Sequence, residues 1–312
     1  MKQTYRDVTI NDAKADMIDQ ANDIIATYQA DGYDLTLRQL YYQFVARDLL
    51  PKKWADPATG STNNIRSYKK LGEIISDGRY AGRIDWAAIK DRTRELGENV
   101  HWRNPAELVR VYGKHYRLDT RIDQENYIEV WVEKDALEGV IERSCRKLDV
   151  PWLSCRGYVS ASTMQESALR LIRQERHGKD TIILHFGDHD PSGIDMTRDM
   201  QARLAEFGSS AKIVRIALNM DQVEAFNPPP NPAKETDSRF KGYIEAHGEE
   251  SWELDALDPH VITDLIEVAI GELTDESRRS DLRRKEEKHK IELRVVEKRW
   301  SDVIEFLNPS SD

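Results

Sequence analysis

Residues 181–193 read TIILHFGDHDPSG, an apolar, β-branched run that stops at a glycine and two closely spaced aspartates. Runs of this kind, bounded by Gly and Pro, predict a buried strand. Similar strands are predicted at 127–132, 152–156 and 212–218, in alternation with helices at 135–148, 160–175 and 192–207. Strands that alternate with helices favour a parallel sheet. We therefore predict an α/β domain with a mostly parallel, four-stranded sheet.

Three carboxylates follow two of these strands. Glu133 comes directly after the first strand, and Asp188 and Asp190 come just after the third. Ligands of open parallel sheets bind beyond the carboxyl ends of the strands. Carboxylate oxygens there suit Mg²⁺, with Mn²⁺ as an alternative ion. Gly187 and Gly193 would let the backbone approach closely. The alternative is a capped turn without a metal, which the same residues also form well.

The N-terminal third predicts helices at 11–30, 36–50 and 63–76, followed by a short β wing at 78–86. Helix, loop, basic helix and wing are the parts of a winged helix-turn-helix. The chain has a net charge of −10, yet residues 36–94 hold 12 Lys/Arg and 6 Asp/Glu, a net of +6. Such a basic segment favours nucleic acid as a partner. The residues expected to contact it are Arg66, Lys69, Lys70, Arg79 and Arg83, with Lys134 and Arg156 from the sheet domain.

The predicted second helix contains a pair of adjacent tyrosines. A buried stripe at helical spacing is formed by Leu37, Leu40, Tyr41 and Phe44. Tyr42 lies off that stripe, one turn after Arg38 and on the same face. We therefore expect Tyr41 in the core and Tyr42 with an exposed oxygen beside a cation, as a nucleophile requires. The alternative is a packed aromatic helix without chemistry.

These motifs together resemble a known family. Glu133-Lys134 after one strand and residues 187–193 after a later one look like a TOPRIM domain. With the preceding helix TLRQLYY (36–42), the chain resembles the A subunit of type IIB topoisomerases and their meiotic double-strand-break relatives. It is most similar to the compact, stand-alone "Mini-A" proteins of mobile elements and phages. Gln39 departs from the aspartate that the family usually has at this position.

The resemblance implies a function and partners. Tyr42 would attack double-stranded DNA with help from Arg38, and Glu133, Asp188 and Asp190 would hold Mg²⁺. A homodimer is implied, in which each tyrosine meets the partner's metal. We recognise no ATPase domain, so an ATPase that drives strand passage would be a separate subunit. A metal-dependent nuclease without a covalent intermediate and a non-catalytic DNA-binding adaptor remain alternatives.

The predicted layout is a winged-helix domain at 1–95, a linker at 96–126, a TOPRIM domain at 127–274 and a charged helix at 275–312. We expect a cytoplasmic protein without membrane contact. The first residues show no apolar leader, and the apolar runs are too short to span a bilayer. The only cysteines, Cys145 and Cys155, form no disulfide framework.

Overall fold

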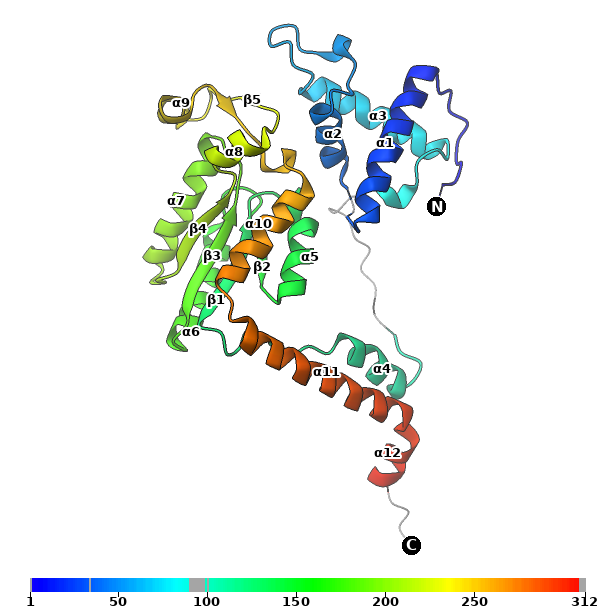
Figure 1. The fold of residues 1–312 in the computed structure, drawn as a ribbon, viewed down its shortest axis with the longest axis vertical. Coiled ribbons are helices and arrows are strands. Elements are labelled where there is room, and N and C mark those ends of the chain that lie inside the picture. The colour runs from blue at the N-terminus through cyan, green and yellow to red at the C-terminus, as the bar shows by residue number, and fades with distance from the viewer. Residues whose placement is uncertain (1, 34, 90–98, 100, 309–312) are drawn as a thin grey trace.

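The computed structural model describes residues 2–33, 35–89, 99 and 101–308. Figure 1 shows three parts: a group of N-terminal helices, a layered α/β unit, and a helical arm that extends away from both. The helix at the base of the arm leads directly out of the α/β unit.

The N-terminal helices are α1 (Asp12–Ala30), α2 (Leu37–Ala46) and α3 (Ile65–Tyr80). Each begins after a side chain that accepts a backbone N–H: Asn11, Thr36 and Asn64. At α2, Thr36 and Gln39 form a reciprocal capping box. The predicted helices are thus confirmed, although α2 ends at Ala46 and not at residue 50. A 3₁₀ helix, Lys52–Trp54, lies in the loop that follows.

The predicted β wing at 78–86 is wrong. Helix α3 continues through Gly78 to Tyr80, and the next element is a 3₁₀ helix, Trp86–Ala88. Within the described residues, the segment makes one isolated bridge, Thr4–Ala81, and the bridge Leu35–Ile89 lies just after it. The glycine has a packing role, because a Cβ at Gly78 would lie 2.9 Å from Ile84 Cδ1. Close packing of α3 against Ile84 and against Ile18 of α1 therefore explains the glycine that had suggested a turn.

The central sheet confirms the predicted α/β architecture. Its strands are β1 (Asn126–Val132), β2 (Trp152–Ser154), β3 (Asp180–Phe186) and β4 (Lys212–Ala217). They are parallel, in the order β2-β1-β3-β4. Val132 pairs with Phe186, so β1 and β3 end at the same level. Residues that follow these two strands are therefore neighbours.

Helices cover both faces of the sheet (Figure 1). One face packs on α5 (Glu138–Leu148), which follows the 3₁₀ helix Asp135–Leu137, and on α10 (Pro259–Glu272); this core is continuous with that of α1–α3. The other face packs on α6 (Ala161–Arg176) and α7 (Pro191–Glu206).

The remaining elements are α8 (Met220–Phe226), α9 (Phe240–His247), the 3₁₀ helix η4 (Leu254–Ala256) and the antiparallel pair β5 (Asn231–Pro232) and β6 (Glu250–Ser251).

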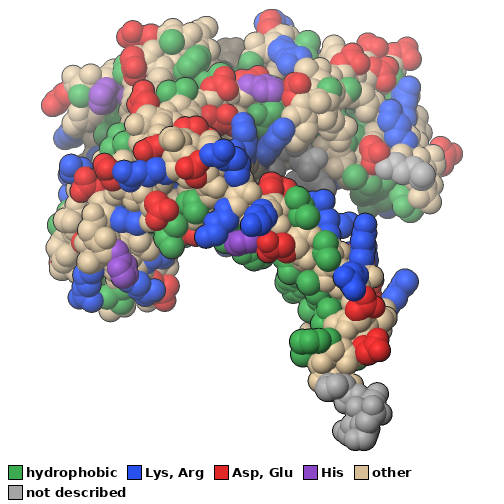
Figure 2. Space-filling model, turned by 60° about the horizontal axis from the view of Figure 1, so that its bottom comes forward, with side chains coloured by type: hydrophobic (Ala, Val, Ile, Leu, Met, Phe, Trp, Pro, Cys, Tyr) green, Lys and Arg blue, Asp and Glu red, His purple; other side chains and the backbone are tan. Residues whose placement is uncertain are grey.

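The arm consists of α4 (Pro105–His115), α11 (Glu276–Lys298) and α12 (Trp300–Leu307). Helix α4 lies in the segment predicted as a linker and packs along α11, where the Tyr116 hydroxyl is 2.9 Å from His289 Nδ1. Figure 2 shows Lys and Arg side chains gathered where the arm meets the α/β unit. In the described part of the chain, no helix has the length and apolar character to cross a membrane.

Candidate functional site

The carboxyl ends of β1 and β3 bring the predicted acidic residues together. Glu133 Oε2 accepts a hydrogen bond from the Asp188 backbone N–H at 2.9 Å. Asp190 begins α7, where its Oδ1 accepts from the Gly193 N–H at 2.6 Å. Glu133 and Asp188 are buried, and Asp190 is half-buried. The structure therefore places all three carboxylates at one edge, as the strand ends predict.

The turn between β3 and α7 requires its glycines. A Cβ on Gly193 would lie 2.3 Å from the Asp188 carbonyl oxygen, and one on Gly187 would lie 3.1 Å from Glu133 Oε2. Arg215 of β4 fixes the same turn, since it donates to the carbonyls of Gly193 at 2.9 Å and Gly187 at 3.0 Å and to that of Asp188. This arginine therefore positions the acidic residues.

Lys134 lies among three carboxylates. Its Nζ is 2.8 Å from Asp188 Oδ2, 3.0 Å from Glu253 Oε2 and 3.2 Å from Asp255 Oδ1. Buried charges are tolerated only when they are paired, and Asp188 and Asp255 are both buried. The ammonium group of Lys134 is therefore engaged within the site, and its contact with nucleic acid stays a prediction.

Tyr42 joins the same network. Its hydroxyl donates to Glu253 Oε2 at 2.6 Å, and Arg38 Nη2 lies 3.5 Å from the Tyr42 oxygen. Arg38 also pairs with Glu253 and, at 2.9 Å, with Asp255 Oδ2. The shared face of Arg38 and Tyr42 is confirmed. The expected exposure of Tyr42 is wrong: the residue is 3% exposed, since α2 packs on its helical neighbours and on η4.

The neighbouring tyrosine has a different role. The Tyr41 oxygen accepts a hydrogen bond from the Asn64 N–H at 2.8 Å, and its hydroxyl is 3.2 Å from the Thr62 carbonyl oxygen, next to the start of α3. Tyr41 is buried, as predicted. Both tyrosines line a cavity of about 230 Å³ that also touches Asn231. Tyr41 thus stabilises a helix start, while Tyr42 contacts ionised groups.

Burial and charge set the protonation of the site. Burial raises the pKa of Glu133, and repulsion from Asp188 and Asp190 raises it further, to about 8. Burial would also raise the pKa of Glu253, but Lys134, the Tyr42 hydrogen bond and Arg38 outweigh it and hold that pKa at about 2. Burial, followed by the charges of Asp255 and Glu253, raises the pKa of Tyr42. At neutral pH, Tyr42 is therefore protonated and Glu253 is ionised.

The three predicted ligands suit Mg²⁺ by donor type, and their mutual repulsion would be relieved by a cation. They do not form a preassembled cage: across the described residues, no three His, Cys, Asp or Glu side chains are grouped to hold a metal ion. Asp188 Oδ1 accepts from the Leu254 N–H at 2.8 Å, and Oδ2 pairs with Lys134. A divalent cation would therefore have to displace Lys134 from Asp188.

The remaining residues expected on nucleic acid lie in different settings. The exposed ones are Arg66, Lys69, Arg83 and Arg156. Lys70 is half-buried, with its Nζ 5.3 Å from the centre of the Trp54 ring. Arg79 is used internally, because it donates to the carbonyls of Trp86 at 3.0 Å and Ile89 at 2.5 Å. Its contact with nucleic acid stays a prediction.

Sequence reasoning missed Glu253, Asp255 and Arg215. Glu253 and Asp255 lie in the segment TrpGluLeuAspAlaLeu (252–257), which has the look of a packing element. Their spacing repeats that of Asp188 and Asp190, and this repeated acid-x-acid pattern was the available signal. For Arg215, a lone arginine inside a strand gave no comparable signal.

Comparison with known proteins supplies no relative. No family model, no curated protein and no solved structure matches this chain. The chemistry of the site therefore has to be inferred from its own residues and contacts.

Proposed function

We propose that this protein is a metal-dependent, DNA-cleaving transesterase that resembles the A subunit of type IIB topoisomerases. The observation that carries the proposal is the continuity of the site. The Tyr42 hydroxyl is joined to the acidic edge of the sheet through Glu253 and Lys134, over contacts of 2.6 to 3.0 Å. Tyr42 also lines a cavity, from which a phosphodiester could reach its oxygen.

In the proposed reaction, the Tyr42 oxygen attacks phosphorus and forms a 5′-phosphotyrosyl bond, while the bond to the 3′-oxygen breaks. The phenolic proton passes to Glu253, and the 3′-oxygen takes a proton from solvent. Arg38 stabilises negative charge on the phosphate. Glu133, Asp188 and Asp190 would hold Mg²⁺, which supplies positive charge at the phosphate and the leaving oxygen.

Lys134 links the parts of this mechanism. While Lys134 contacts Glu253, the pKa of Glu253 is held at about 2, so Glu253 is a weak base. If Lys134 moved from Asp188 toward a bound phosphate, the pKa of Glu253 would rise and its strength as a base with it. The contacts of Lys134 thus describe a resting state that the substrate would disrupt.

Double-stranded DNA is the proposed partner, gripped by the exposed cations Arg66, Lys69, Arg83 and Arg156. We also propose a homodimer, which light scattering after size exclusion would detect. Tyr42 already meets the acidic edge of its own chain through Glu253. The exchange of tyrosines between two copies would therefore require this contact to open. A separate ATPase subunit and a cytoplasmic location belong to the same proposal.

A metal-dependent nuclease is the second candidate, and the burial of Tyr42 favours it. Burial and nearby carboxylates raise the pKa of Tyr42, which opposes formation of the phenolate. In that reaction, water would attack phosphorus and Tyr42 would only hold Glu253 in place. The non-catalytic adaptor is the remaining alternative.

The deciding experiment compares the two tyrosines. Wild type, Tyr42→Phe and Tyr41→Phe are incubated with end-labelled DNA and Mg²⁺ or Mn²⁺, then denatured and separated on a gel. The proposal expects a covalent protein–DNA adduct with wild type and Tyr41→Phe and none with Tyr42→Phe. Free cut ends from Tyr42→Phe at the wild-type rate would establish the nuclease instead. If every protein binds the DNA and none cuts it, the non-catalytic adaptor is the function that remains.

A further inference from the structure

A second cavity lies at the opposite end of the sheet from the acidic site. It has a volume of about 500 Å³ and is bordered by Tyr127 near the start of β1, Trp152 at the start of β2 and Lys179 just before β3. A strand of 7 residues separates this end from Glu133, a distance of roughly 20 Å. The cavity therefore belongs to neither Tyr42 nor the acidic residues.

The walls of this cavity are basic. Four cations line it, Arg117, Arg121, Arg146 and Lys179, against two carboxylates, Asp119 and Asp149. The carboxylates are engaged by other groups: Asp149 Oδ2 accepts from the Thr120 N–H and hydroxyl at 2.8 Å, and Asp119 Oδ1 accepts from the Arg121 backbone N–H at 2.8 Å. Four cations against two carboxylates leave the lining with a net charge of +2.

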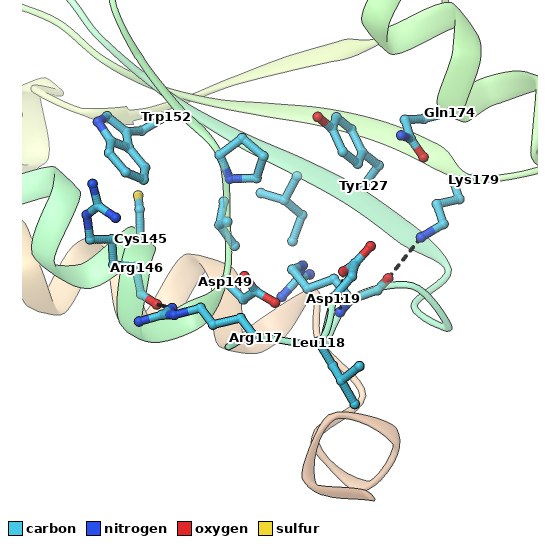
Figure 3. A pocket seen from close by; sticks show the side chains of 14 residues that line it. Arg117, Leu118, Asp119, Tyr127, Cys145, Arg146, Asp149, Trp152, Gln174 and Lys179 are labelled. Carbon is cyan, nitrogen blue, oxygen red and sulfur yellow. Dashed lines mark hydrogen bonds between the residues drawn. The ribbon is translucent and has the colours of Figure 1, made fainter. Parts of the chain in front are cut away.

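The cations themselves contact mostly neutral oxygens. Arg117 donates to the Arg146 carbonyl at 2.7 Å, and Lys179 donates to the Arg121 carbonyl at 2.9 Å (Figure 3). Of the four, Arg146 alone makes an ion pair with another described residue, Glu142, at 2.6 Å. A net positive charge around a cavity favours an anion as its occupant.

Arg121 has buried N–H groups without hydrogen-bond partners among the described residues. It is 6% exposed, and it donates from Nη1 to the Thr274 hydroxyl at 3.1 Å. Its Nε and Nη2 are buried and have no hydrogen-bond partner in the part of the chain that the structure describes. Burial lowers the pKa of Arg121 and a second buried arginine, Arg279, adds to that effect, while nearby carboxylates oppose it: Asp149, Asp119 and Glu276. Burial of guanidinium N–H groups without hydrogen-bond partners is costly, so an anion close to Arg121 would be stabilising.

An aromatic surface completes the cavity. Figure 3 shows Trp152 and Arg146 at one end and Gln174 and Lys179 at the other. The Arg146 guanidinium lies 5.0 Å from the centre of the Trp152 ring, and the indole is half-buried. A flat aromatic group at one end and an unpaired cation at the other match the two parts of a nucleotide, a base and a phosphate. The volume is also in the range of small-ligand sites.

We propose that this cavity binds a nucleoside phosphate, with the phosphate beside Lys179 and Arg121 and the base against Trp152. The site would be separate from the proposed DNA-cleaving site and would not depend on that activity. The phosphate would compensate the charge of Arg121, and the Gln174 amide would offer a donor or acceptor to the sugar or phosphate.

Calorimetric titration of the full-length protein with AMP, adenosine and inorganic phosphate tests the proposal. AMP is expected to bind measurably at about 1 mM or below and more tightly than either fragment. Lys179→Gln should weaken AMP binding by about tenfold, because a charge-assisted contact is lost. Lys212→Gln, a change of the same type outside the cavity, should leave binding unchanged. Equal binding of AMP by Lys179→Gln and wild type, or no binding of AMP, would overturn the proposal. Phosphate that binds as tightly as AMP would overturn the nucleotide assignment.

A second variant separates ligand binding from folding. Arg121→Met keeps the length of the side chain and removes the buried charge, so the free protein should melt at the same temperature or higher. Wild type should be stabilised by AMP, and the variant should lose that stabilisation. A variant that melts lower than wild type yet still gains stability from AMP would assign Arg121 to folding alone and contradict the proposal. Adduct formation with DNA by Tyr42 should be the same in both proteins, so failure here leaves the transesterase proposal untouched.

Discussion

At the carboxyl end of the sheet the cations are held in ion pairs with carboxylates, whereas at the amino end they mostly contact neutral oxygens. Lys134 contacts three carboxylates, and Arg38 pairs with two of the same three. At the other end, Arg121 and Lys179 make no ion pair with any described residue. A paired network is stable without a ligand and must be opened by its substrate. An unpaired set of cations gains stability only when an anion arrives.

The largest expected effect comes from removing the cation at the carboxyl end. Lys134→Met should lower the free energy of unfolding by about 3–5 kcal/mol, because it leaves the buried carboxylate of Asp188 without an ion-pair partner. Lys179→Met at the amino end should cost about 1 kcal/mol or less, the value of one hydrogen bond to a carbonyl. Urea unfolding of both variants measures the difference. Equal losses would show that the two ends do not differ as described.

The next effect concerns the turn that holds the acidic residues. Gly193→Ala should destabilise the protein by about 1–3 kcal/mol, because the added methyl would meet the Asp188 carbonyl oxygen. Gly271→Ala is the matched control, since a Cβ there meets nothing within 4 Å inside helix α10. It should stabilise the protein by up to about 1 kcal/mol. Thermal unfolding distinguishes the two variants. If Gly193→Ala does not lower the melting temperature, the tight turn does not constrain the acidic residues.

The pH dependence of stability should also differ between the ends. Because the pKa of Glu133 is raised from 4.5 to about 8, the folded state holds more protons than the unfolded state within this window. Stability should therefore fall as the pH rises from about 4.5 to 8. Glu133→Gln should remove most of this slope between pH 6 and 8 and stabilise the protein at pH 8 by at least about 1 kcal/mol. Burial also raises the pKa of Asp188, to about 6, so a slope below that pH should remain. Asp119→Asn at the amino end is the control, and an unchanged slope between pH 6 and 8 in Glu133→Gln would assign the titration to another group.

The smallest effect is on the salt dependence of DNA binding. Replacing Arg66 and Lys69 together with Ala should flatten the slope of log K against log salt by up to about 0.9 for each lost phosphate contact. Arg173 and Arg176, two exposed cations on α6, serve as the matched control pair. If both pairs change the slope equally, DNA does not prefer the α3 surface. AMP should not compete with DNA, since the two proposed sites lie at opposite ends of the sheet.

Local features of the chain predicted most of the fold. The helix starts follow from Asn11 and Thr36, whose side chains satisfy backbone N–H groups three residues away. The strands follow from short β-branched runs, and the parallel sheet follows from their alternation with helices. The acidic edge was predictable for the same reason, because Glu133 and Asp188 are placed by the ends of their own strands.

Contacts between distant segments decided the rest. The Tyr42–Glu253 hydrogen bond joins residues 211 positions apart, and the contact of Lys134 with Asp255 spans 121. Periodicity shows which face of α2 is apolar, but not that the opposite face meets a second set of charges. Caps and strand ends involve neighbours in the chain, so the sequence alone determined them. The pairing of buried charges depends on which side chains the folded backbone brings together, so only the tertiary structure decided the burial of Tyr42 and the neutralisation of Lys134.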